Sequence, residues 1–88
     1  ASLGGAFTLA ALAVPEADFD FVTEQVNSFE QIAHNYRRDH DFNMWFVIAT
    51  ESTEEIEKVV QAIEIKTGLK VLNVPKLKEF YVSLYLPV

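Results

Sequence analysis

The sequence contains no cysteine, three glycines and only seven basic residues against thirteen acidic ones. The lack of cysteine excludes a disulfide framework, a thiolate zinc site and a thiol nucleophile. The net charge of −6 argues against binding to duplex DNA, because neutralising phosphates requires clustered lysine and arginine. No apolar run reaches the roughly 20 residues of a membrane span, and no basic segment precedes residues 6–14 as in a signal peptide. These absences predict a cytoplasmic protein that contacts neither membrane nor DNA.

The chain is nevertheless rich in core-forming residues. Half of its 88 residues are apolar and 12% are aromatic, which is enough for one hydrophobic core and too much for a disordered chain. We therefore predict a single domain over residues 1–88. Because the chain begins at Ala1 without a methionine, we expect it to be one part of a longer protein.

Two segments have helical spacing. The first opens at Pro15 with acidic residues in its first turn, which favour a helix N-terminus, and stops near Asn27. Its apolar face comprises Phe19, Val22, Val26 and Phe29. The second begins with Ser52 or Thr53 as its cap and ends at Gly68. Its apolar stripe comprises Ile56, Val59, Val60 and Ile63.

Strands account for most of the remaining chain. We predict them over residues 6–14, 32–38, 42–49 and 71–74 with 80–86, the last interrupted from Pro75 to Lys78. A polar turn joins the second and third strands as a hairpin. The order β-α-β-β-α-β predicts an α+β ferredoxin-like domain, in which an antiparallel sheet carries both helices on one face.

The predicted strands are apolar on both faces. In the first strand one face has Phe7, Leu9 and Ala11, and the other has Ala10, Leu12 and Val14. In the third, Trp45, Val47 and Ala49 oppose Phe42, Met44, Phe46 and Ile48. Since the helices cover only one face, the other needs a partner sheet, and we predict a homodimer or heterodimer formed by sheet packing.

The segment 33–46 holds both histidines, both arginines and the only tryptophan. Strand alternation divides it between two faces, with His34, Tyr36 and Arg38 on one and Asn35 and Arg37 on the other. The first face suits a flat anionic ligand. Arginine binds carboxylates, tyrosine donates a hydrogen bond, and neutral histidine moves a proton or ligates a metal.

A plainer interpretation of the same segment is a polar hairpin at the domain edge, in which both arginines pair with Asp39 and Asp41.

Elsewhere, the acidic residues Glu51, Glu54, Glu55 and Glu57 indicate a solvated helix start, and Phe80, Tyr81 and Tyr85 indicate core and interface aromatics. No phosphate-binding glycine loop, serine elbow or zinc-ligand spacing is present, so no protein metal site is predicted.

Residues 34–46, HNYRRDHDFNMWF, resemble the signature hairpin of the sirohaem decarboxylases, Lrp/AsnC-like proteins of the haem d1 and alternative haem pathways. The resemblance runs from about Leu3 to Leu86. Supporting segments are LGGA at 3–6, AVP at 13–15, TGL at 67–69 and VLNVP at 71–75. The two-helix scaffold by itself is common to all Lrp/AsnC effector domains of the RAM type.

The resemblance implies a carbon–carbon lyase. Such enzymes remove carbon dioxide from the acetate side chains at C12 and C18 of sirohaem, giving 12,18-didecarboxysirohaem. The resemblance implies no cofactor beyond this iron tetrapyrrole substrate, and a homodimer or a heterodimer with a paralogous subunit. Family members normally carry an N-terminal helix-turn-helix-like segment, which residues 1–88 do not include, so the resemblance does not imply that this domain is active alone.

Roles for individual residues follow from the resemblance and the chemistry. His34 is the predicted proton donor or contact to the substrate iron, and Tyr36 assists it. The predicted substrate-binding residues are Arg37, Arg38, His40, Asn43 and Trp45. Of the two arginines, which we expect to bind peripheral carboxylates, only Arg38 shares the face of His34.

Two other functions remain open at this point. The chain also fits an Lrp/AsnC-family transcription-regulator effector domain that binds a small metabolite and mediates oligomerisation, or a purely structural dimerisation domain. The hairpin favours the enzyme, because an amino-acid sensor has no need for two histidines and two arginines beside a tryptophan.

Overall fold

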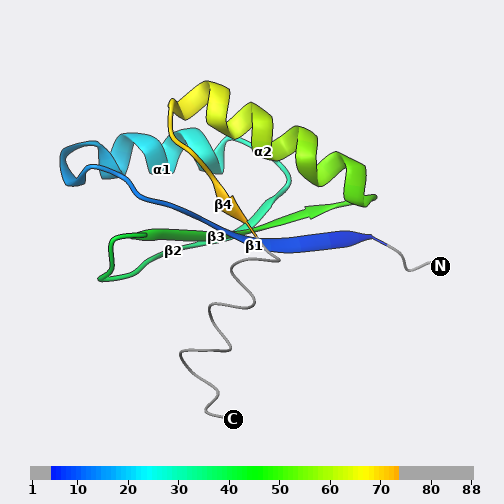
Figure 1. The fold of residues 1–88 in the computed structure, drawn as a ribbon, viewed down its shortest axis with the longest axis horizontal. Helices are drawn as coiled ribbons and strands as arrows, with labels where there is room; N and C mark the ends of the chain where they lie inside the picture. The colour runs from blue at the N-terminus through cyan, green and yellow to red at the C-terminus, as the bar shows by residue number, and fades with distance from the viewer. Residues whose placement is uncertain (1–4, 74–88) are drawn as a thin grey trace, which may run out of the picture.

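The computed structural model describes residues 5–73, in which two helices lie against one face of an antiparallel sheet (Figure 1). The strands are β1 Ala6–Leu12, β2 Ile32–Arg37, β3 Met44–Thr50 and β4 Leu72–Asn73. The helices are α1 Phe19–Asn27 and α2 Thr53–Thr67, and a 3-10 turn, η1 Glu16–Asp18, precedes α1. The sheet order is β2-β3-β1-β4. This arrangement confirms the predicted ferredoxin-like architecture; the strand predicted over residues 80–86 lies outside the described residues.

Local sequence signals explain where the helices begin and end. Ser52, rather than Thr53, caps α2, and its Oγ accepts a hydrogen bond from the Glu55 N–H at 3.4 Å. The Glu55 carboxylate accepts in return from the Glu51 N–H at 3.0 Å. At the other end Gly68 takes the left-handed conformation, with φ of 74°, and its N–H donates to the Glu64 carbonyl at 2.8 Å. Neither of the α-helices described has the length and apolar character that crossing a bilayer requires.

The start of the first helix differs from the prediction. Pro15 opens the 3-10 turn rather than the α-helix itself, and the Asp18 N–H donates to the Pro15 carbonyl at 2.8 Å. The α-helix begins only at Phe19. This is the first residue of the predicted apolar face and the first buried residue of α1. The proline therefore turns the chain out of the sheet before α1 begins.

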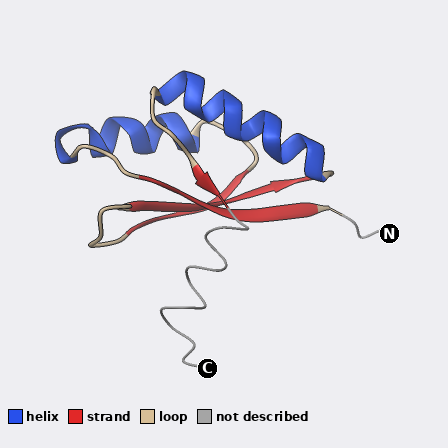
Figure 2. Cartoon of the chain, in the orientation of Figure 1, coloured by secondary structure: helices blue, strands red, loops and turns tan. Residues whose placement is uncertain are grey.

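The hydrophobic core lies between the two helices and the sheet, as Figure 2 shows for the two layers. Its largest fully buried side chains are Leu12, Val26, Met44, Phe46, Ile48 and Ile63. The core residues of β3, Met44, Phe46 and Ile48, are alternate residues, as are Ala10 and Leu12 of β1, because successive side chains point to opposite faces of a sheet. The helices contribute the stripes that the 3.6-residue spacing predicts, with Val22 and Val59 also buried.

The face of the sheet away from the helices is also apolar, as predicted. The pairing of β1 with β3 aligns Phe7 with Ala49, Leu9 with Val47 and Ala11 with Trp45 on this open face. Phe7 is 79% exposed and Leu9, Val47 and Trp45 are half-buried, whereas Ala11 is fully buried. We call this surface the open face.

One feature of β2 was absent from the prediction. Ile32 pairs with Ile48 of the core, yet His34 pairs with Val47 of the open face, so the register shifts by one residue at Ala33. This shift is a β-bulge, in which two residues of one strand oppose one residue of its partner. Strict alternation would instead have put Ile32 and His34 on the same face. The bulge therefore allows Ile32 to be in the core and His34 to be on the open face.

The left-handed conformation of Gly68 provides a test of the α2 terminus. A Cβ built on Gly68 meets no atom within 4 Å, so replacement by alanine introduces only backbone strain. We expect Gly68→Ala to lower the free energy of unfolding by about 1 kcal/mol and Gly68→Asn to lower it less, since asparagine tolerates this conformation. Urea denaturation measures both variants, and equal stability of the alanine variant and the unaltered protein would contradict the assignment.

Candidate functional site

Four predicted site residues gather on the open face: His34, Tyr36, Arg38 and Trp45, here called the open-face cluster. The His34 and Tyr36 rings are stacked, with centroids 5.9 Å apart and planes 10° from parallel. Tyr36 pairs with Trp45 across β2 and β3. The guanidinium carbon of Arg38 lies 5.8 Å from the Trp45 ring centroid, within the range of a cation–π interaction. The prediction that Arg38 shares the face of His34 is therefore confirmed.

The open-face cluster is exposed but held in place. Trp45 is half-buried, and its Nε1–H donates to the Phe42 carbonyl at 2.6 Å, which fixes the plane of the indole. The Tyr36 side chain is 55% exposed. The cluster thus presents aromatic surface, a guanidinium and an imidazole together, a combination suited to a flat ligand with acidic substituents.

Arg37 lies on the other face of the sheet, toward the helices. Its Nη1 is 2.8 Å from Oε2 of Glu16, and its guanidinium carbon is 3.8 Å from the Phe19 ring centroid. Arg37 therefore joins β2 to η1 and α1, away from the open-face cluster, and its predicted role on substrate carboxylates stays a prediction. In the plainer interpretation, the pairing of both arginines with Asp39 and Asp41 is wrong. Within residues 5–73 the one ion pair of either arginine is that with Glu16.

Asn43 uses its side chain to extend the sheet beyond the end of β1. Its Oδ1 accepts from the Val14 N–H at 2.9 Å, and its Nδ2 donates to the Val14 carbonyl at 2.9 Å. The Asn43 side-chain amide thereby bonds to the backbone N–H and carbonyl of Val14 as a neighbouring strand would. This placement indicates a structural role, and the predicted contribution of Asn43 to substrate binding remains untested.

His40 lies in the turn between β2 and β3. Its Nδ1 accepts from the Phe42 N–H at 3.0 Å, and the two rings are stacked with centroids 6.4 Å apart. The Arg38 N–H donates to the Asn43 carbonyl at 2.9 Å and closes the hairpin. His40 therefore stabilises the turn, and its exposed ring is on the same hairpin as the open-face cluster.

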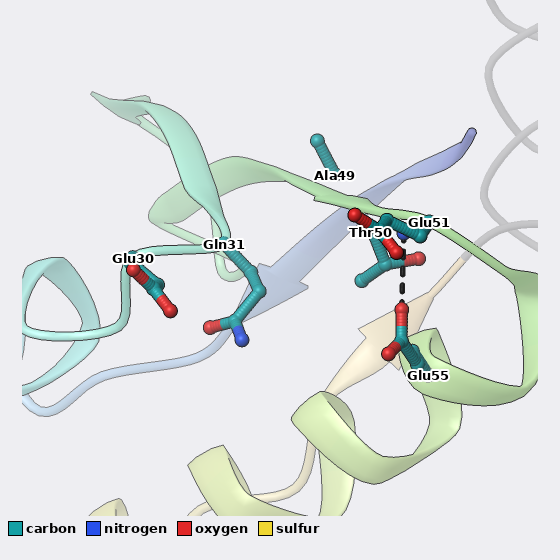
Figure 3. Close-up of a pocket in the computed structure, with 6 residues that line it drawn as sticks. All are labelled: Glu30, Gln31, Ala49, Thr50, Glu51 and Glu55. Atoms are coloured by element: carbon teal, nitrogen blue, oxygen red, sulfur yellow. Dashed lines mark hydrogen bonds between the residues drawn. The ribbon is translucent and has the colours of Figure 1, made fainter. Parts of the chain in front are cut away.

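A separate cavity of about 500 Å³ lies at the opposite end of β2 and β3, where β2 begins and β3 ends (Figure 3). Its lining comprises Glu30, Gln31, Ala49, Thr50, Glu51 and Glu55. Two of its glutamates belong to the predicted solvated helix start, and the third, Glu30, joins them only through the fold. Three carboxylates disfavour an anionic ligand there. In the described part of the chain no group of three acidic or histidine side chains is arranged to hold a metal ion.

Comparison with known proteins places this chain in a family. The model of the AsnC-like ligand binding domain matches residues 2–81. A protein of Stutzerimonas stutzeri named "Siroheme decarboxylase NirG subunit" is 55% identical over 98% of this chain and 58% of its own length. The "Siroheme decarboxylase NirD subunit" of the same organism is 41% identical over 99% of this chain and 57% of its own length. The chain thus spans a little over half the length of these relatives.

A solved structure shares the fold. The crystal structure of the siroheme decarboxylase NirDL in complex with an iron-uroporphyrin III analogue superposes with a TM-score of 0.71. The two sequences are 32% identical, and the match covers 78% of this chain and 23% of the other. The likeness therefore extends over most of the described sheet and helices.

The two hydrogen bonds between Asn43 and Val14 predict a stability effect. Asn43→Ala leaves both polar groups of Val14 without this partner and should lower the free energy of unfolding by about 2 kcal/mol. Asn43→Asp keeps the acceptor for the Val14 N–H but sets a charged oxygen against the Val14 carbonyl, so its loss should be at least as large. Urea denaturation of the two variants checks the order, and an alanine variant as stable as the unaltered protein would refute the structural role.

Proposed function

Because the chain belongs to the AsnC-like ligand-binding domain family, we propose that it is a sirohaem decarboxylase subunit with carbon–carbon lyase activity. The reaction removes carbon dioxide from the C12 and C18 acetate side chains of sirohaem and gives 12,18-didecarboxysirohaem. The observation that carries this proposal is the 55% identity to a NirG subunit over 98% of the chain. The open-face cluster supports it with a chemically suitable surface.

For this reaction the protein needs only to orient the substrate and to supply a proton. In each step the bond between the acetate methylene carbon and its carboxylate breaks, and carbon dioxide leaves. The electron pair passes into the conjugated macrocycle, and a proton added to the methylene carbon completes a methyl group. The substrate is its own electron sink, so we propose no added cofactor. The protein orients and desolvates the carboxylate and supplies the proton.

The open-face cluster provides a residue for each task. We assign the proton donor, or a contact to the substrate iron, to His34, with Tyr36 stacked beside it to assist. Arg38 binds a peripheral carboxylate, since its guanidinium is the one arginine head on this face within residues 5–73. Trp45 offers the ring surface on which a macrocycle stacks.

The apolar open face also provides a surface through which two subunits could associate. Phe7, Leu9 and Val47 form apolar surface beside the cluster, and a face of this kind favours association. Stutzerimonas stutzeri has both a NirD and a NirG subunit similar to this chain. We therefore propose a dimer through the sheets, formed with a second copy or with a paralogous subunit.

The rival function, a regulator effector domain that senses a small metabolite, has less support. Relatives named as siroheme decarboxylase subunits match over nearly the whole chain. The one feature in its favour among the described residues is the acidic cavity in Figure 3, which would suit a cationic metabolite.

Turnover of sirohaem tests the catalytic assignment. His34→Gln keeps a polar side chain without the proton donor, so we expect decarboxylation to slow by roughly 10²–10⁴-fold. Tyr36→Phe should cause a smaller loss. Anaerobic incubation with sirohaem, with and without a candidate partner subunit, followed by mass spectrometry of the product, measures the rate. Sirohaem titration by absorbance separates binding from chemistry, and full turnover by the glutamine variant would remove His34 from the mechanism.

Two exposed phenylalanines on opposite sides of the molecule test the dimer. Phe7→Glu places a charge on the open face and should shift the protein toward monomer at micromolar concentration in light scattering. Phe21→Glu is the matched control, because Phe21 is 64% exposed on α1, on the helical side of the sheet. A stable monomer of the unaltered protein, or equal effects of the two substitutions, would contradict association through the open face.

A further inference from the structure

A small pocket lies at the bulge of β2, at the edge of the sheet and beside the end of α1. It has a volume of about 280 Å³ and is lined by Asn27, Ile32, Ala33, His34 and Asn35. Ligand sites for whole small molecules are usually about 300–1,000 Å³, so this pocket has room for a side arm rather than a macrocycle. Because β2 is an edge strand, the pocket is reached from the side of the sheet.

The two asparagines give the pocket its chemistry. Asn35 Nδ2 donates to Asn27 Oδ1 at 3.0 Å, which couples β2 to the last residue of α1. Within residues 5–73 no hydrogen bond engages the Nδ2 of Asn27, so both of its N–H groups are available. No acidic residue lines the pocket. These amide donors suit a carboxylate.

We propose that this pocket is a subsite for one carboxylate-bearing arm of the tetrapyrrole, with Asn27 as a binding residue. The inference rests on the proposed function and extends it to residues outside the hairpin. His34 belongs both to the pocket lining and to the open-face cluster. An arm held in the pocket therefore lies at the edge strand that carries His34, whose side chain points to the open face while that of Asn35 points to the helical face. The acidic cavity at the other end of β2 would repel the same arm.

The bulge explains why such a pocket exists at this position. An extra residue bends the strand that carries it and re-aims the neighbouring side chains. Here the extra residue is Ala33, which lines the pocket together with Asn27 and His34. The same bulge that puts the His34 side chain on the open face thus leaves Asn35 on the helical face, where it bonds to Asn27.

Asn27→Asp tests the subsite. The aspartate retains an oxygen that accepts from Asn35, so the fold is preserved, but its charge repels a carboxylate. The probes are sirohaem and iron octaethylporphyrin, whose side chains are all ethyl groups without a carboxylate, each titrated by absorbance into the complete protein with its partner subunit. We expect the substitution to weaken sirohaem binding about tenfold or more and binding of the carboxylate-free porphyrin much less. Asn27→Leu, which removes the donors without adding charge, should weaken sirohaem binding by a few-fold.

Gln61→Glu is the matched control, because it makes the same amide-to-acid change at an exposed position of α2. It should leave binding of both probes within about twofold of the unaltered protein. Unchanged sirohaem binding by Asn27→Asp, or equal weakening by Asn27→Asp and Gln61→Glu, would overturn the subsite and leave the proposed function standing. Failure of the unaltered protein to bind sirohaem would overturn the proposed function and this inference together.

Discussion

The antiparallel pairing of β2 with β3, shifted by one residue at Ala33, decides which side chains of the hairpin meet solvent and which meet the helices. Before the shift Ile32 packs into the core beside Ile48, and after it His34 and Tyr36 face outward. Side chains alternate with a period of two, so a single inserted residue exchanges the faces of everything beyond it. The open-face cluster, the position of Arg37 and the pocket at the bulge all depend on this register.

Some residues of the hairpin motif stabilise the hairpin, and others point outward to the surface. Asn43 completes the sheet at Val14, and His40 stabilises the turn. Arg37 joins the hairpin to the helical layer through Glu16 and Phe19. These contacts order the backbone from which His34, Tyr36 and Arg38 project. A motif this dense therefore combines residues that position the site with residues available to a ligand, as a preorganised site requires.

The distribution of charge agrees with the proposed function better than the net charge does. The chain has a net charge of −6, yet the open-face cluster has a guanidinium and the pocket at the bulge has neutral donors. Three of the glutamates gather instead at the far end of β2 and β3. Short-range interactions dominate at the site, because exposed charges farther away than about 8–10 Å are largely screened at physiological salt. An acidic protein can thus hold an anionic tetrapyrrole.

Periodicity and capping signals were sufficient to predict the element order, the two helical stripes and the apolar open face, because each depends on contacts between near neighbours in the chain. The N-cap at Ser52 and the left-handed Gly68 are local in the same sense. The 3-10 turn after Pro15 and the bulge at Ala33 were not predicted. A bulge leaves no mark on one strand alone, since it exists only relative to the partner strand.

The sequence by itself determined the fold class, the family resemblance and the fact that His34, Tyr36 and Arg38 share one face of β2. Only the tertiary structure decided that Arg37 binds Glu16 rather than its neighbouring aspartates, that Asn43 bonds to Val14, and that Asn27 lies beside Asn35. The physical reason is the distance along the chain. The partners of Arg37 and Asn43 are 21 and 29 residues away. Which distant groups come into contact depends on how the helices pack on the sheet, and a local sequence pattern does not contain that information.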